Sequence, residues 1–205
     1  MPAGVIPPGL RSSILLLCLL CLQSQGWSQR GGERVFEFVN LPTSSRATAL
    51  GGSQIAVFSN DYGLVGGNPA LLNETMNNEV IFQHNFHFDG IDNGYAGYAK
   101  QLKDTKTTVH GGVHYMSYGN FTAADDMGNV LGSFKAKDIA LTAGVARQLN
   151  ERMHGGIRLQ YIQSTLEAYT SSGLMLDAGI TYQSEDKLNH YALVLRGTGF
   201  QFSGY

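Results

Sequence analysis

Cysteine is almost absent from this chain. Its 205 residues include only Cys18 and Cys21, which lie in one apolar stretch near the start. If that stretch is a cleaved leader, no thiol remains in the mature chain. Disulfide bridges, zinc–thiolate sites and cysteine nucleophiles are then excluded together.

Charged residues are also scarce, and long apolar runs are missing. Asp, Glu, Lys and Arg make up 15% of the chain, against about 25% in an average soluble domain. The formal net charge of -2 gives no electrostatic reason to expect binding to nucleic acid. After residue 28, no apolar run is long enough for a transmembrane helix. The 26 glycines exceed the usual share of about 7%, which disfavours an ordinary helical enzyme.

Residues 1–28 have the pattern of a secretory signal peptide. Arg11 precedes an apolar core at 14–22, and small residues follow the core at Gly26 and Ser28. We expect cleavage after Ser28, with cleavage after Gly26 as the alternative. The chain is therefore divided into a signal peptide (1–28), an N-terminal segment (29–78) and a strand region (79–205).

From residue 79 onward, apolar and polar residues alternate with the period of two that is typical of β-strands. In the segment 153–163, Ile157 and Leu159 share one face while Arg158 and Gln160 share the other. The pattern predicts seven strands, over 79–88, 94–102, 107–118, 139–149, 153–163, 174–182 and 190–202. Four polar residues are expected to point into the lumen of a barrel: His154, Arg158, Gln160 and Asp177.

The connections between these strands are of two kinds. Those at 102–106, 150–152 and 185–189 are short and charged, the one at 119–137 is long and polar, and the one at 165–172 is intermediate. Outer-membrane barrels have short periplasmic turns and longer external loops, with strands of about 9 to 11 residues. The pattern therefore predicts an antiparallel transmembrane β-barrel whose connection 119–137 lies outside the cell.

A soluble β-sandwich is the alternative, because it also has short alternating strands. Glycines within the strands, polar side chains in mid-strand and tyrosines near strand ends favour the barrel. Seven is an odd number of strands, whereas single-chain bacterial barrels close with even numbers. We therefore expect this chain to form an incomplete barrel.

The N-terminal segment has a different pattern from the strand region. Gly51-Gly52 and Gly66-Gly67 divide it into pieces too short to span a membrane, and Pro69 excludes a central strand. We expect a compact hatch inside or below the barrel, in which Arg46 is buried against acidic residues of the lumen. The residues that define this hatch motif are Arg46, Gly51, Gly52, Asn68, Pro69 and Ala70.

The order Ser45-Arg-Ala-x-Ala-Leu-Gly-Gly52, Asn60-Asp61 and Asn68-Pro-Ala70 resembles the hatch of FadL-type outer-membrane barrels. Four further motifs make the chain similar to the PorV/PorQ group of FadL-like barrels in the type IX secretion system. They are Phe38-x-Asn-Leu-Pro42, Asn68-Pro-Ala-Leu-Leu-Asn73, Tyr118-Gly-Asn-Phe121 with Gly132-Ser-Phe134, and the stretch from Ser164 to Gly173. The resemblance extends from about residue 33 to residue 205.

The resemblance implies an outer-membrane location in a Gram-negative bacterium and a scaffolding role. In that group, a barrel of this type holds a PorZ-like peripheral protein beside the sortase-like PorU and its barrel PorV. That complex attaches secreted cargo to lipopolysaccharide. A FadL-like transporter of hydrophobic small molecules is the alternative, since fold alone does not determine function.

No catalytic, cofactor or metal site is predicted. His84 and His87 face opposite sides of a strand, and His110 and His114 are about 13 Å apart along one, too far to share an ion. The chain contains neither a Gly-x-Ser-x-Gly elbow nor a phosphate-binding glycine motif. We therefore expect a non-enzymatic protein, and the resemblance implies that its partners are the attachment complex and outer-membrane lipid.

Overall fold

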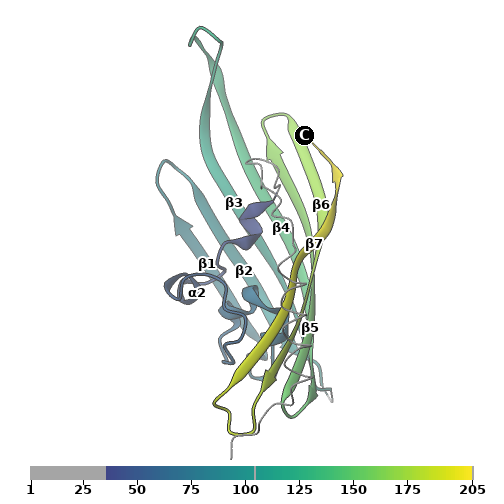
Figure 1. Ribbon diagram of the computed structural model, residues 1–205. Helices are drawn as coiled ribbons and strands as arrows, with labels where there is room; N and C mark the ends of the chain where they lie inside the picture. The colour runs from purple at the N-terminus through teal and green to yellow at the C-terminus, as the bar shows by residue number, and fades with distance from the viewer. Residues whose placement is uncertain (1–35, 104, 205) are drawn as a thin grey trace, which may run out of the picture. The chain divides into compact units, whose positions relative to one another are not determined.

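The computed structural model describes residues 36–103 and 105–204 (Figure 1). The expected signal peptide and residues 29–35 of the N-terminal segment lie outside the described residues. No helix among those described has both the length and the hydropathy needed to span a bilayer.

The strand region forms one antiparallel sheet, so the described chain is all-β with a few short helices. Seven strands lie in the sheet in chain order, each paired with the next. They are β1 (Glu79–Phe86), β2 (Asp92–Gln101), β3 (Thr107–Ala124), β4 (Val130–Asn150), β5 (Met153–Leu166), β6 (Tyr169–Gln183) and β7 (His190–Ser203). β1 and β7 are the two edges, so the described part of the chain is an open sheet and not a closed barrel.

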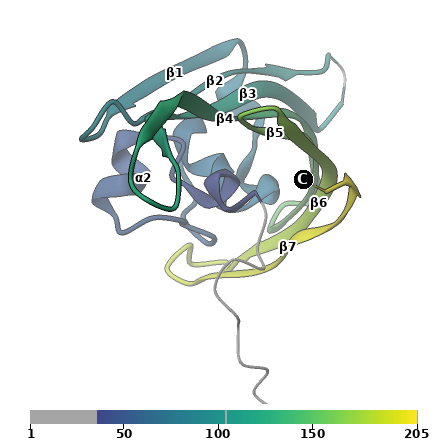
Figure 2. The same ribbon diagram turned by 90° about the horizontal axis from the view of Figure 1, so that it is seen from above.

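The sheet curves around the N-terminal segment (Figure 2). We call the face toward that segment the concave face and the opposite one the convex face. The concave face carries the buried polar side chains Arg158, Gln160 and Asp177, whereas Ile157 and Leu159 on the convex face are exposed. The predicted alternation is confirmed. Other exposed convex side chains include Val80, Phe82, Leu141, Val145, Leu176, Leu193 and Leu195.

The prediction of a long loop at 119–137 is wrong. β3 continues to Ala124 and β4 begins at Val130, so only a five-residue turn separates them. Its glycines and polar residues have a loop-like composition, but they lie in two paired strands whose Phe121 and Phe134 rings stack at 5.2 Å. The intermediate connection 165–172 is likewise only a turn between Leu166 and Tyr169. The two ends of the sheet therefore do not differ in the length of their loops. They differ in how far the strands extend.

The described part of the N-terminal segment, from residue 36 to residue 78, contains five short helices, each too short to be stable alone. They are η1 (Glu37–Asn40), α2 (Ser45–Ala49), η2 (Tyr62–Gly67), η3 (Pro69–Leu71) and η4 (Glu74–Met76). Every helix after η1 begins at a polar residue whose side chain accepts a hydrogen bond from a backbone N–H of the first turn. These caps satisfy N–H groups that helices of this length leave free. The capping residues are Ser44, Asp61, Asn68 and Asn73.

Two apolar clusters join the N-terminal segment to the concave face. The larger contains Tyr62, Val65, Leu71, Leu72 and Met76 together with Ala99 and Ala146 of the sheet. The second packs Phe38 and Val39 against Ala140 and Ile162. The N-terminal segment therefore packs on the concave side of the sheet.

Candidate functional site

The centre of the concave face is a buried ion pair between Arg158 of β5 and Asp177 of β6. The two residues are direct cross-strand partners, so the sheet register places both side chains on the same face. Arg158 donates to the Asp177 Oδ2 atom from Nε at 2.9 Å and from Nη2 at 2.6 Å. Only 6% and 2% of the two side chains are exposed. A pair so far from water is stable only when its other hydrogen-bonding atoms are also satisfied.

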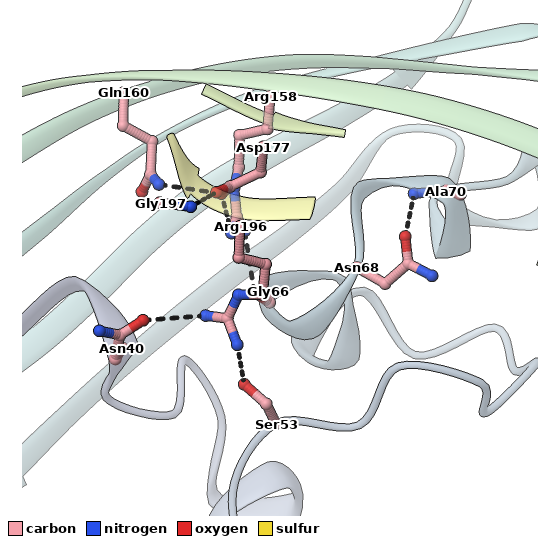
Figure 3. Close-up of polar contacts among 10 residues, drawn as sticks. All are labelled: Asn40, Ser53, Gly66, Asn68, Ala70, Arg158, Gln160, Asp177, Arg196 and Gly197. Carbon is pink, nitrogen blue, oxygen red and sulfur yellow. Dashed lines mark hydrogen bonds and ion pairs between the residues drawn. The ribbon is translucent and has the colours of Figure 1, made fainter. Parts of the chain in front are cut away.

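Two further groups donate hydrogen bonds to the Asp177 carboxylate (Figure 3). The Gln160 Nε2 atom donates to Oδ2 at 3.1 Å, and the backbone N–H of Gly197 donates to Oδ1 at 2.7 Å. The register of β6 and β7 shifts between Leu176 and Ala178. Because Gly197 has a φ of 67° at this irregularity, its N–H points toward the carboxylate rather than into a regular ladder.

Two arginines of the sheet also donate to the N-terminal segment, as Figure 3 shows. The Arg158 Nη1 atom donates to the Gly66 carbonyl at 3.0 Å. Arg196 of β7 donates to the Ser53 Oγ atom at 2.8 Å and to the Asn40 Oδ1 atom at 3.3 Å. We call Arg158, Gln160, Asp177 and Arg196 the arginine cluster. The two arginines of this cluster donate to neutral acceptors of the N-terminal segment, and Arg158 also pairs with Asp177.

The Asn68-Pro69-Ala70 turn packs directly onto the sheet beside this cluster. Asn68 is fully buried, accepts from the Ala70 N–H at 2.9 Å and donates to the Ile55 carbonyl at 2.8 Å. Gly156 and Gly179 are cross-strand partners beneath it. A Cβ atom at Gly179 would lie 2.0 Å from the Asn68 Oδ1 atom, and one at Gly156 would lie 2.5 Å from the Pro69 carbonyl carbon. The turn can approach the sheet only because these two positions lack side chains.

Arg46 does not occupy the predicted place. Its side chain is 55% exposed and pairs at 3.2 Å with Asp61 of the N-terminal segment. The expectation that it is buried against acids of the lumen is therefore wrong. The concave acid Asp177 is already saturated by Arg158, Gln160 and Gly197, and Arg46 can reach Asp61 without leaving water.

The other predicted residues have separate positions. Gly51 and Gly52 have φ angles of 88° and 114° and end helix α2, a conformation that favours glycine. His154 lies on the concave side, where its ring contacts Phe58. His154 and Glu74 line a cavity of about 310 Å³ near the short turns. No hydrogen bond joins His154 to the arginine cluster. The structure thus brings together Arg158, Gln160 and Asp177 and leaves His154 and Arg46 apart.

A second buried layer was not predicted from the sequence. The Tyr62 hydroxyl lies 3.2 Å from His110 Nδ1 and 3.3 Å from the Tyr95 hydroxyl. Burial raises the pKa of Tyr62 above its usual value, so this hydroxyl stays protonated and neutral. His114 packs against Phe38 at 5.3 Å. The shared face of His110 and His114 was visible in the alternation. Their partners in the N-terminal segment, Tyr62 and Phe38, are about 50 residues or more away in sequence and carry no local signal.

The site holds the N-terminal segment on the sheet through hydrogen bonds. Within residues 36–103 and 105–204, no group of three His, Cys, Asp or Glu side chains is arranged to hold a metal ion. The acid of the arginine cluster, Asp177, accepts hydrogen bonds from Arg158, Gln160 and the backbone N–H of Gly197. Comparison of the chain with protein-family models, with curated proteins and with solved structures finds no match.

Proposed function

We propose that this chain is part of an outer-membrane β-barrel in the type IX secretion system, where it acts as a scaffold that anchors the surface attachment complex. The observation that carries the membrane part of the proposal is the polarity of the sheet. Its convex face is apolar and exposed, while its concave face holds a buried ion pair. Transmembrane barrels have this arrangement because their outer face contacts lipid.

The dimensions of the apolar band on β4 support this location. The convex side chains Lys137 and Arg147 flank an uninterrupted apolar series from Ile139 to Val145. Ten residues of strand span about 33 Å, which a tilt of about 40° reduces to about 25 Å, the usual height of the lipid-facing band. Lysine and arginine at the two limits can extend their charges toward the headgroups on either side.

A membrane location also requires partners for the two edges of the sheet. The backbone groups of β1 and β7 that face outward would each cost several kcal/mol if they remained unpaired in lipid. The proposal therefore includes further strands between β7 and β1, as the resemblance to FadL-like barrels implies. The PorU and PorV proteins and a PorZ-like peripheral protein are the proposed partners.

The filled concave face favours a scaffold over a transporter. The N-terminal segment occupies this face and is fixed by Arg158, Arg196 and two apolar clusters. A route for hydrophobic molecules along this face would have to displace those contacts and pass the charged pair of Arg158 and Asp177. Scaffolding needs no such route.

Substitution of lipid-facing residues tests the membrane location. Leu159 on β5 lies within the apolar band, whereas Leu131 on β4 lies in the projecting part of the β3–β4 hairpin and is 72% exposed. An arginine near the bilayer midplane costs about 2 to 4 kcal/mol, and the cost falls toward zero outside the band. We expect Leu159→Arg to reduce the folded fraction in outer membranes, measured by heat-modifiable migration in gels. Leu131→Arg is the matched control and should migrate as the unaltered protein does.

The two candidate functions differ in what cells lose without the protein. We expect a strain that lacks it to release cargo that is not attached to the surface, while its uptake of oleate is unchanged. Restoring the gene should restore attachment. The opposite pattern, with normal attachment and reduced oleate uptake, would contradict the scaffold and favour the transporter.

A further inference from the structure

The β3–β4 hairpin projects beyond the neighbouring strands (Figure 1). Pairing of β2 with β3 ends at Ser117, and pairing of β4 with β5 ends at Ala136. Beyond Ser117, β3 pairs only with β4 among the described residues. The segment Asn120–Ala124 of β3 therefore has a backbone edge that no described strand covers.

The projecting hairpin is internally ordered. The rings of Phe121 and Phe134 stack with an interplanar angle of 16°. At the tip, Asp125 accepts hydrogen bonds from the backbone N–H groups of Met127 and Asn129 and from the Asn129 side chain. The hydrogen bond from the Asn129 side chain is the main cause that lowers the pKa of Asp125, so the turn is stable with this carboxylate ionised. A partner would bind this preformed edge without first having to order it.

The free edge of β3 lacks the features that usually prevent strand addition. The segment Asn120–Ala124 contains no charged residue and no proline, although natural edges are commonly protected by one or the other. Its pairing with β4 is regular from Asn120 to Ala123. The opposite edge is less suitable, because the register shift beside Gly132 leaves Leu131 as an unpaired bulge on β4.

The turn between β1 and β2 lies at the base of this free edge. The Asp89 carbonyl lies so close to Gly119 that a Cβ atom there would be 2.8 Å from it. Phe88 in the same turn is 82% exposed. The free edge therefore begins next to the β1–β2 turn, which also carries this exposed ring.

We propose that this free edge is a docking site for a soluble protein partner, one extended segment of which adds to Asn120–Ala124 as a further strand. The inference rests on the proposed function and requires that the hairpin lie outside the cell, on the side where a surface attachment complex is held. Main-chain hydrogen bonds to the free edge would supply affinity, and alternate side chains would supply specificity.

The side chains around the free edge define the chemistry of the partner segment. A residue beside Phe121 would be apolar or aromatic, since such cross-strand pairs are favourable. Asp125 and Asp126 at the tip are unopposed by any described basic side chain within the turn. The end of the segment near the tip is therefore basic, and the exposed Met127, Val130 and Leu131 extend the apolar contact.

Lysine substitutions test whether the edge is needed. A lysine at Thr122 would place a charge on the free edge, which disfavours strand addition. Thr165 on β5 is the matched control, because strands pair with it on both sides, at Lys137 and at Thr170. In outer membranes of cells that produce the full-length protein, we expect Thr122→Lys to reduce the retained peripheral partner about tenfold. Thr165→Lys should retain it. Both variants should fold, as judged by heat-modifiable migration.

Cysteine cross-linking tests the geometry of docking. Single cysteines at Asn120, Thr122 and Ala124 lie on one face of β3, so their cross-links should fall on residues spaced by two within one partner segment. Thr165→Cys should give none. Cross-links scattered over the partner, or undiminished retention by Thr122→Lys, would overturn the docking site. If the unaltered protein retains no soluble partner at all, the proposed scaffold function fails as well.

Discussion

Replacement of Asp177 by leucine should destabilise the protein by about 3 to 5 kcal/mol, the cost of removing one partner from a buried ion pair. The change leaves the guanidinium of Arg158 buried with only the Gly66 carbonyl as a partner. It also leaves Gln160 and the N–H of Gly197 without their acceptor. The free energy of unfolding in urea, followed by circular dichroism of the strands, measures the effect.

Arg158→Met should cost less than Asp177→Leu, because the remaining carboxylate keeps its bonds from Gln160 and Gly197. The double variant Arg158→Met/Asp177→Leu should recover most of the stability, since no central charge is left buried. Asp126→Leu is the control for loss of an acid at a surface turn and should change stability by no more than about 0.5 kcal/mol. Strictly additive effects in the double variant would contradict a coupled pair.

The sequence was sufficient to assign the faces of the sheet. Period-two alternation depends only on neighbouring residues, so the inward orientation of Arg158, Gln160 and Asp177 could be predicted. The pairing of Arg158 with Asp177 requires the register of β5 and β6, which local pattern does not determine. Arg196 was missed because the strand 190–202 alternates poorly near a register shift.

Strand length and the position of Arg46 could not be predicted for a different reason. Glycine and polar residues are frequent both in loops and in the projecting part of a hairpin, so composition between 119 and 137 was misleading. The location of Arg46 depended on which acids were free. Asp61 is nearby and only half-buried, so it costs less to reach than a buried carboxylate that already has four hydrogen bonds.

Two glycines within the strands, Gly156 and Gly179, have a structural role that the composition did not indicate. In the sequence, glycines within the strands served only as a feature typical of barrels, and Gly179 was not singled out. The structure gives Gly156 and Gly179 a definite role beneath the Asn68-Pro69-Ala70 turn. Residues about 90 to 110 positions apart in sequence form this contact, and no short-range pattern links them.

Gly179→Ala should loosen the N-terminal segment from the sheet. The added methyl group would collide with the Asn68 Oδ1 atom, which caps η3 and is fully buried. Overpacking of this kind costs about 1 to 3 kcal/mol. Gly111→Ala is the matched control, because the nearest atom to its Cβ would be the Thr142 carbonyl oxygen at 3.7 Å. There the substitution should be neutral or should stabilise by up to about 1 kcal/mol, since alanine lowers the entropy of the unfolded chain.

Trypsin provides a specific measurement of this loosening, because Arg46 is the only lysine or arginine between residues 36 and 99. Cleavage after Arg46 follows the population in which the segment is open, so a cost of 1 to 3 kcal/mol corresponds to cleavage about 5 to 150 times faster. Asn68→Ser shortens the colliding side chain but keeps an oxygen that can cap the helix. Combined with Gly179→Ala, it should return the cleavage rate most of the way to that of the unaltered protein. Equal rates for Gly179→Ala and Gly111→Ala would mean that the turn does not rest on these glycines, and the filled concave face would then lose its support as an argument for a scaffold.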